Sequence, residues 1–290
     1  FLHNAGLSFL PTSVFAKTGL AGDLWYQLLK RLYRMVWRPE AIYLSLGGIG
    51  FAGVVLSNQR QIGERLFGGW GAAMIGLHAL FGRFGWGHRY EIYVWAVTLV
   101  GLLLLYRSSL RRFFRRASPV VSVAAIVMLG FLTGAQYIRG LVQIPRASHE
   151  IYLQQYQMHR FLTEHYQAPA AVHDLGWTSY RNDHYILDLA GLANLRALHL
   201  RRQSRPEWRR EAVRPYADSV QAALIYAPPG NVPTEWTPVA TLQFGWRSIA
   251  AARNTVYFYA LDPSALSDMR KALRDFQSTL PSDATLKFLP

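Results

Sequence analysis

The chain has 290 residues, of which 51% are hydrophobic, and a formal net charge of +14. It contains no cysteine, which excludes disulfides and thiolate chemistry. Residues 1–144 hold 15 basic and 4 acidic residues, a net of +11, whereas residues 145–290 hold 16 and 13, a net of +3. Because the basic residues flank apolar runs, we expect membrane lipid and no nucleic acid as a partner.

Residues 1–40 contain an amphipathic stretch at 20–38. Leu24, Leu28 and Leu32 recur there at helical spacing. The pattern predicts an external loop followed by a helix in the membrane interface, with packing on the rim of a helix bundle as the alternative. Since the chain begins with Phe1, we also expect the natural protein to begin further upstream.

Four apolar segments predict transmembrane helices, at 41–57, 66–82, 90–106 and 117–138. A helix needs about 20 residues to cross a bilayer, so the first three segments are long enough only if the predicted helices extend into the flanking residues. The alternative is a buried helical hairpin in a large core. The prediction is therefore an α-helical membrane bundle of about four helices within residues 41–140, followed by an extracytoplasmic α/β domain.

The segments that join the apolar runs predict the orientation. Residues 107–116 carry five Arg, which places them in the cytoplasm by the positive-inside rule, and 57–65 follow by alternation. Loop 83–89 and all residues after 140 then lie outside.

After residue 140 the pattern becomes that of an α/β domain, expected over 141–290. Alternating and β-branched runs predict strands, and apolar residues at helical spacing predict helices. The expected strands are 170–176, 185–191, 221–227 and 255–261, and the expected helices are 148–167, 196–217 and 263–280.

The loop GRFGWGHRYEIY at 82–93 is the first candidate site. Its charged and polar residues are Arg83, His88, Arg89, Tyr90 and Glu91. A guanidinium fork suits phosphate oxygens, and an ionisable group beside a span usually faces a partner or a wet cavity. We expect these residues to bind a lipid phosphate, with Glu91 orienting one arginine; the alternative is a purely structural pairing of Glu91.

A second group of polar residues follows the first predicted strand of the C-terminal domain. It comprises His173, Asp174, Asp183 and His184. The spacing fits no standard metal site, so we expect a polar loop with ordinary hydrogen bonds and keep a metal site only as the minor alternative. The sequence also has no dinucleotide-binding, phosphate-loop, zincin or serine-hydrolase motif. No cofactor is therefore evident, and a divalent metal is an unsupported alternative.

Three stretches in order resemble the GT-C superfamily of bacterial membrane glycosyltransferases, which use polyprenyl-phosphate sugars. They are LPTSVFAKTG (10–19), FGRFGWGHRYEIYVWA (81–96) and VHDLGWTSYRNDHYILDLAGLAN (172–194). The resemblance covers nearly the whole chain and corresponds to the C-terminal part of such an enzyme. It implies an integral protein of the bacterial inner membrane that binds a polyprenyl-phosphate-linked sugar.

The resemblance also implies residue roles. Lys17 would lie at the lipid phosphate, with a solvated loop lysine as the alternative, and the 83–91 residues would line the donor or acceptor mouth. The C-terminal motif comprises Asp174, Gly176, Tyr180, Asp188 and Gly191. Its glycines most simply allow turns. Its aspartates either contact sugar hydroxyls or make capping and turn hydrogen bonds.

One departure from the family concerns catalysis. The family's catalytic carboxylate lies in an early external loop that has no counterpart here, and Asp23 is not assigned that role. We therefore expect the C-terminal part of a transferase that moves a sugar to an extracytoplasmic glycan, lipid or protein acceptor, with the catalytic residue unknown. The alternative is a non-catalytic, membrane-anchored domain that binds glycan or protein. A transporter is disfavoured because the apolar segments hold few polar residues, mainly His78 and Thr98.

Overall fold

A computed structural model of the chain describes residues 39–82, 84, 89–203 and 206–290, together with Thr12, Tyr26, Leu29, Lys30 and Tyr33. Contacts divide the chain into a helical unit built on Lys17–Val142 and an α/β unit built on Gln143–Pro290. The predicted interfacial helix at 20–38 lies largely outside the described residues.

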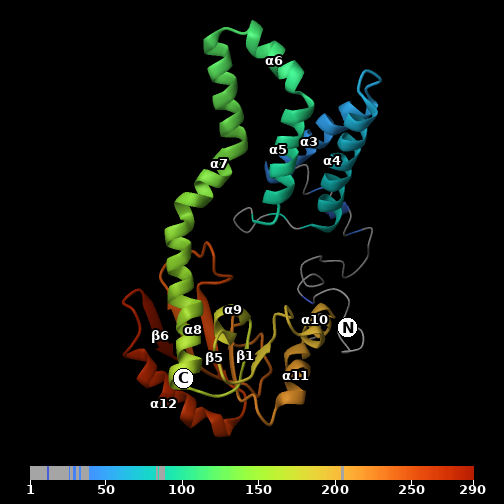
Figure 1. Ribbon diagram of the computed structural model, residues 1–290. Coiled ribbons are helices and arrows are strands. Elements are labelled where there is room, and N and C mark those ends of the chain that lie inside the picture. Colours follow the sequence, from blue (N-terminus) through green and yellow to red (C-terminus); the bar gives the residue numbers. More distant parts are fainter. Residues whose placement is uncertain are drawn as a thin grey trace. The chain divides into compact units, whose positions relative to one another are not determined.

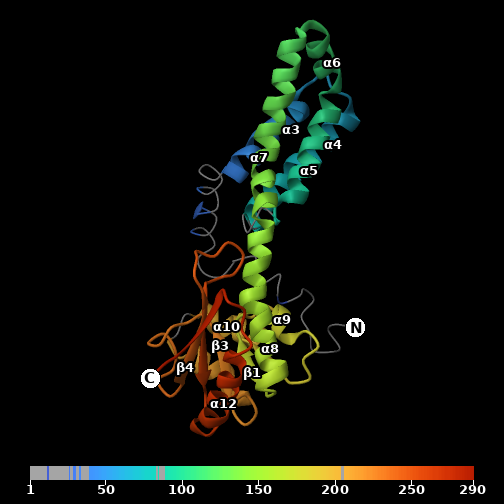
Figure 2. The same ribbon diagram turned by 90° about the vertical axis from the view of Figure 1, so that its left-hand side faces the viewer.

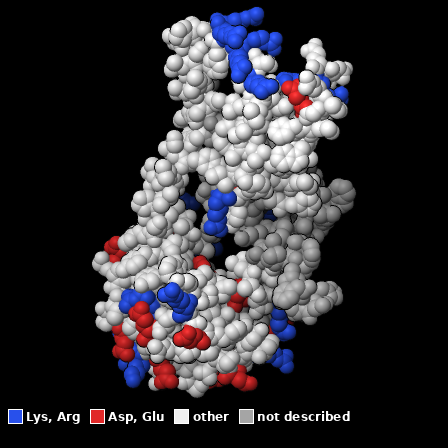
Figure 3. Space-filling view, in the orientation of Figure 1, with Lys and Arg blue, Asp and Glu red and all other residues white. Residues whose placement is uncertain are grey.

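The helical unit consists of α3 (Pro39–Leu56), α4 (Ile62–Phe81), α5 (Ile92–Leu105), α6 (Arg107–Arg116) and the first part of α7 (Pro119–Ile151) (Figure 1). Helices α3, α4 and α5 pack on one another. The basic side chains of α6 gather at one end of the unit (Figure 3). The prediction of a connecting loop at 107–116 is wrong, because this segment is helical.

Close helix packing in this unit depends on small residues around the buried ring of Phe51. A Cβ atom at Gly71 would lie 2.6 Å from that ring, and one at Gly101 would lie 3.0 Å from it. Two helices therefore approach the third only because these positions have no side chain.

Gly71→Ala is expected to destabilise the helical unit, whereas Gly76→Ala is expected to leave it unchanged or stabilise it. Both glycines lie in α4, but a Cβ at Gly76 would meet nothing within 4 Å. An alanine in a helix interior gains roughly 0.5–1 kcal/mol over glycine, while overpacking costs roughly 1–3 kcal/mol. The midpoint of thermal unfolding, followed by circular dichroism at 222 nm, should fall for Gly71→Ala and stay the same or rise for Gly76→Ala. Equal shifts of the midpoint in the two variants would contradict this packing.

The predicted bundle of four transmembrane helices is wrong. Within the described part of the chain, no single helix is long and apolar enough to cross a membrane. The apolar parts of α3 and α7, Ala41–Leu56 and Pro119–Phe131, fall in the range of 10–17 residues, short of the about 20 that a span needs. Helices α5 and α6 reach the length and apolar composition of a membrane span only when they are taken together. They bend by 67° where they meet. The chain instead combines helices with a six-stranded sheet, as in an α/β protein.

The sheet of the α/β unit has the strand order β2-β1-β3-β5-β4-β6. Strands β2, β1 and β3 are parallel, and the other neighbours are antiparallel. The strands are β1 (Ala170–Val172), β2 (Ile186–Asp188), β3 (Ala222–Ile225), β4 (Thr237–Phe244), β5 (Thr255–Ala260) and β6 (Ala284–Phe288).

Helices cover both faces of this sheet (Figures 1 and 2). The end of α7 continues through two π-helical turns and α8 to cover one face with α12, and α10 and α11 cover the other. Successive side chains of a strand therefore point to opposite faces. Val172 packs in the core under α8 and α12, and Ala171 packs in the core under α10 and α11. The helical elements are η1 (Tyr152–Tyr156), α8 (Gln157–Arg160), η2 (Phe161–His165), α9 (Leu175–Ser179), α10 (Leu195–Arg202), α11 (Trp208–Val213), η3 (Arg214–Tyr216), η4 (Pro263–Ala265) and α12 (Leu266–Gln277).

Candidate functional site

The carboxyl ends of two paired parallel strands bring polar residues together. Strand β1 ends at Val172 and is followed by His173 and Asp174, and the neighbouring β3 ends at Ile225 and is followed by Tyr226. In open α/β sheets, ligands bind at this edge. The order of the elements therefore puts these three side chains where a ligand site is expected.

A cluster of hydrogen bonds fixes the inner part of this edge. The hydroxyl of Tyr226 lies 3.2 Å from the carboxylate of Asp174 and 3.3 Å from Oε1 of Gln154, and Nε2 of Gln155 donates to the same Asp174 oxygen at 3.1 Å. Burial, reinforced by the Asp174 charge, raises the pKa of Tyr226 well above its usual value. The phenol therefore keeps its proton at physiological pH, and Asp174 serves as its acceptor.

His173 is held as a neutral hydrogen-bond donor. The backbone N–H of Tyr226 donates to its Nδ1 atom at 3.1 Å, which leaves the ring proton on Nε2. Burial, together with the charges of Arg209 and Arg201, lowers the pKa of His173 to about 3. The imidazole is consequently uncharged under physiological conditions and cannot accept a proton at Nε2.

An open cavity of about 550 Å³ adjoins the cluster. Its lining residues are His173, Pro206, Trp208, Arg209, Tyr226, Ala227, Pro228, Gly230, Asn231, Val232 and Arg253. None of these described residues is acidic, whereas two are arginines. The cavity therefore offers hydrogen-bond donors and positive charge to a ligand.

Arg209 is the more rigid of the two arginines. Its guanidinium lies 4.6 Å from the centre of the Trp208 ring, and Nη1 donates to the carbonyl of Asn231 at 2.6 Å. Its Nε atom is buried and has no hydrogen-bond partner among the described residues. Burial also lowers the pKa of Arg209 from its ordinary value. The Trp208 ring and the Asn231 carbonyl thus hold the Arg209 side chain at the wall of the cavity.

The structure places one residue of the predicted C-terminal motif in the Tyr226 cluster and others in turns. Asp174 belongs to the cluster beneath the cavity. Asp188 is buried and accepts three backbone N–H groups, from Ala190 at 2.8 Å, Gly191 at 3.1 Å and Ala193 at 2.7 Å. Its carboxylate therefore holds a turn, the capping alternative.

The remaining motif residues lie away from the cavity lining. Gly191 has φ of +77°, which fits the turn role. Gly176 lies inside α9 and needs no unusual backbone angle. Tyr180 is exposed at the end of α9, beneath the guanidinium of Arg181.

The predicted polar group at 173–184 does not gather as a metal site. The described residues contain no group of three or more His, Cys, Asp or Glu placed to hold a metal ion. His184 instead donates its backbone N–H to the side chain of Asn182 at 2.9 Å, as in a polar loop.

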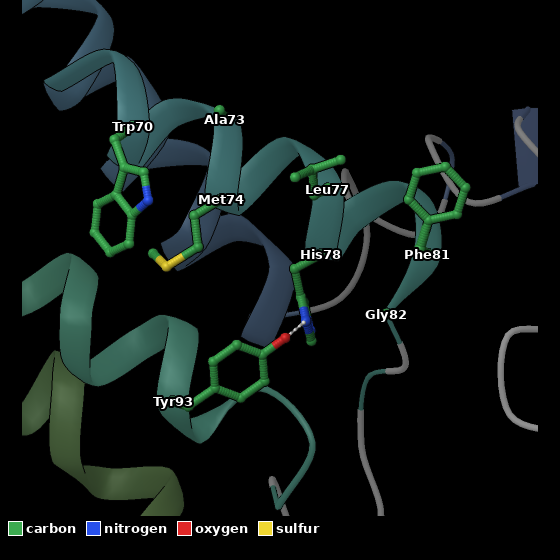
Figure 4. Close-up of a pocket in the computed structure, with 8 residues that line it drawn as sticks. All are labelled: Trp70, Ala73, Met74, Leu77, His78, Phe81, Gly82 and Tyr93. Carbon is green, nitrogen blue, oxygen red and sulfur yellow. Dashed lines mark hydrogen bonds between the residues drawn. The ribbon is translucent and has the colours of Figure 1, made fainter. Parts of the chain in front are cut away.

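A second hollow lies in the helical unit, between α4 and α5, and has a volume of about 580 Å³ (Figure 4). Apart from His78 and Tyr93, its lining is apolar: Trp70, Ala73, Met74, Leu77, Phe81 and Gly82. Figure 4 shows Tyr93 reaching from α5 to His78 on α4, where Nδ1 and the phenol oxygen lie 2.9 Å apart. We call this hollow the apolar groove.

The two ends of the predicted phosphate-binding loop, Gly82 and Tyr93, line the apolar groove, whereas its described candidate residues Arg89, Tyr90 and Glu91 do not. Arg89 donates to the hydroxyl of Tyr90 at 2.9 Å and lies over its ring. Glu91 is fully buried directly before α5. Lys17, Arg83 and His88 lie outside the described residues.

Comparison with known proteins gives one result. A family model described as a domain of unknown function (DUF8728) matches residues 149–259. No curated protein and no solved structure matches the chain. Every residue that lines the polar cavity falls within the matched stretch. The cavity is therefore a feature of the matched domain itself.

Proposed function

We propose that this chain is the C-terminal part of a glycosyltransferase that takes a sugar from a polyprenyl-phosphate carrier, and that its α/β unit binds a sugar-bearing ligand. The observation that carries the proposal is the cavity of about 550 Å³ at the ends of β1 and β3, which Arg209 and Arg253 line. His173, from the 172–194 stretch that resembles the transferase family, lines this cavity. Two arginines and a neutral imidazole suit a ligand with an anionic group and hydroxyls.

The chemistry of the cavity fits binding and not proton transfer. His173 is neutral with its proton on Nε2, and Tyr226 stays protonated, so neither serves as a base. In such a transferase a carboxylate deprotonates the acceptor hydroxyl and the lipid phosphate leaves, with basic groups stabilising its charge. In our proposal that carboxylate lies outside this cavity, and the α/β unit positions the ligand.

The apolar groove is consistent with the proposed lipid carrier. Its lining of aromatic and aliphatic side chains, with the His78–Tyr93 pair as its polar feature, suits the isoprenoid chain of such a carrier. A carrier of this kind resides in a bilayer, so the proposal places the protein at the bacterial inner membrane with the α/β unit on the outer side.

A second candidate is a non-catalytic domain that binds glycan or protein. The observation in its favour is that no described residue lining the cavity is Asp or Glu. Sugar transfer from a labelled polyprenyl-phosphate sugar by membranes that carry the natural gene product distinguishes the two. Transfer supports the enzyme, and ligand binding without transfer supports the binding domain.

Arg253→Gln is expected to weaken the binding of glucose 1-phosphate, used as a probe, by about tenfold or more, because a charge-assisted hydrogen bond is lost. Arg253 is exposed at the cavity, so the change should leave the fold intact. Calorimetric titration of the purified chain measures the affinity.

Arg247→Gln is the matched control for this titration. Arg247 is an exposed arginine that does not line the cavity. The Arg247→Gln variant should therefore bind the probe as tightly as the parent does. Equal affinities for the parent and Arg253→Gln, or binding of inorganic phosphate as tight as that of glucose 1-phosphate, would contradict a sugar site here.

A further inference from the structure

A row of aromatic rings crosses the surface of the α/β unit. We call it the aromatic strip, and it consists of Trp246, His149, Tyr152, Tyr156, Trp177 and Tyr180. The first four rings stack nearly parallel, with centroids 5.8, 6.2 and 5.6 Å apart and planes within 20° of each other. Trp177 then meets Tyr156 edge-on at 5.3 Å, and Tyr180 meets Trp177 at 5.7 Å. No role for this strip follows from the polar cavity.

Helical spacing explains the strip. His149, Tyr152 and Tyr156 follow one another at intervals of three and four residues along α7 and η1, which puts them on one face. Gln154 and Gln155 project from the other side toward the Tyr226 cluster. Helix α9 packs beside η1 and α8 and adds Trp177 (Figure 2). None of the six residues of the strip lines the cavity, so the two surfaces are distinct.

Three rings of the strip are exposed, and contacts with neighbouring groups hold the strip in place. Tyr152, Trp177 and Tyr180 are 45%, 40% and 51% exposed. Trp246 donates its indole N–H to the buried carboxylate of Glu150 at 3.1 Å. The other three rings, of His149, Tyr156 and Trp246, are partly buried. A row of aromatic rings that is held in place and partly exposed is typical of a binding surface, because binding then orders few side chains.

The surroundings of the strip decide its occupant. Arg146 lies over Trp246 and Arg181 over Tyr180, while Asp283 lies 3.0 Å from His149. Each of these two guanidinium groups lies at an end of the strip, and the carboxylate lies beside its second ring. A nucleic acid needs a continuous row of cations, and a lipid or an apolar peptide needs aliphatic contacts, of which the strip itself has none.

A sugar chain meets both conditions. Its C–H groups are weakly positive and pack on the parts of aromatic rings that remain exposed, while its hydroxyls bind charged groups of either sign. We propose that the aromatic strip binds a neutral oligosaccharide or polysaccharide chain that passes over several rings. This deepens the proposed function, on which it rests, because it makes the acceptor of the transferase a glycan.

The test is a ligand-observed NMR titration of the full chain with maltohexaose, cellopentaose and mannopentaose. At least one of these probes is expected to bind, and its monosaccharide is expected to bind about tenfold more weakly because it covers one ring. Tyr152→Ala and Trp177→Ala should each weaken binding about five- to tenfold. Tyr152→Phe retains the ring and should bind like the parent.

Tyr185→Ala is the matched control. Tyr185 is another exposed tyrosine that stacks on a second ring, Tyr216 at 5.4 Å, but it lies outside the strip. It should not change the affinity. Binding by none of the three oligosaccharides, unchanged binding in both Tyr152→Ala and Trp177→Ala, or tighter binding of single-stranded oligothymidylate would overturn the proposal.

The same variants separate this inference from the proposed function. Tyr152→Ala should bind glucose 1-phosphate like the parent, and Arg253→Gln should bind the oligosaccharide like the parent. If glucose 1-phosphate fails to bind while the oligosaccharide binds through the strip, the cavity is not a sugar site and the strip stands. If glucose 1-phosphate binds in the cavity while no oligosaccharide binds to the aromatic strip, the strip is not a glycan site and the proposed cavity site stands.

Discussion

Gly191→Ala is expected to lower the free energy of unfolding of the α/β unit by about 3–5 kcal/mol. Gly191 has φ of +77°, which is strained for alanine by roughly 1–2 kcal/mol. An added Cβ would also lie 2.7 Å from the Cα of Leu198 and 2.8 Å from its nitrogen. Because these are backbone atoms, the clash cannot be relieved by a rotamer change, and α10 would have to move away from the Asp188 turn.

Gly230→Ala separates the two contributions. Gly230 has φ of +92°, but a Cβ there would meet nothing within 4 Å, so only the backbone strain of about 1–2 kcal/mol should remain. Hydrogen exchange of the amides in β1 and β3, measured across a urea series, reports the stability of this unit alone. Equal losses in the two variants would show that the approach of Gly191 to Leu198 contributes nothing.

Glu150→Ala is expected to lower the stability of the α/β unit by about 3–5 kcal/mol. The Glu150 carboxylate is fully buried and accepts hydrogen bonds from the indole of Trp246, the hydroxyl of Ser248 and three successive backbone N–H groups. The backbone bonds from Ile249 and Ala250 are both 2.8 Å long. Alanine would leave these donors, most of them part-buried in the loop between β4 and β5, without their shared acceptor.

Glu164→Gln is the control, since Glu164 is also a carboxylate of this helical segment but is half exposed and pairs with Arg160. An exposed ion pair contributes about 0–1 kcal/mol. Hydrogen exchange in β4 and β5 measures both variants. A loss below about 1 kcal/mol for Glu150→Ala would contradict the role of this carboxylate as the anchor of the loop.

Glu150 also predicts a pH dependence. Burial raises the pKa of Glu150, but the backbone N–H groups of Ala250 and Ile249, together with the Trp246 indole and the N–H of Ala251, outweigh it, and the pKa is lowered from 4.5. A depressed folded-state pKa gives stability that is present above about pH 4.5 and lost as the pH falls through the folded value. The gap in stability between the parent and Glu150→Gln should therefore narrow below pH 4.5.

The sequence predicts much of the α/β unit. The predicted strands at 170–176, 185–191, 221–227 and 255–261 contain β1, β2, β3 and β5. These strands are short apolar runs with clear turn residues around them.

Two strands were missed. Strand β4 begins Thr237-Pro238, and a proline in a candidate strand argues against it. Strand β6 has only five residues, of which Ala284 and Leu286 are buried, too few for a clear alternation.

The membrane bundle was predicted from hydropathy, which adds up apolar residues along the chain without regard to where a helix bends. The apolar run of α5 ends at Leu105, and the chain turns by 67° into the basic α6. Helices therefore lie where the apolar segments predicted them, but no single described helix has both the length and the apolar composition that a span needs.

The candidate site was predicted only in part. Asp174 and His173 were singled out from their motif, and Tyr226 could have been, because it directly follows a buried strand at the carboxyl edge of the sheet. Arg209 and Arg253 lie in α11 and in the loop before β5, and they join His173 only through the tertiary fold. No local pattern distinguishes them from the other arginines of the chain.

A crystal structure of the chain grown with glucose 1-phosphate is the most direct test of sugar binding by the α/β unit. We expect the phosphate against Arg209 and Arg253 and a sugar hydroxyl within hydrogen-bond distance of Nε2 of His173. An empty cavity at a saturating concentration of the ligand, or ligand bound elsewhere on the unit, would contradict it.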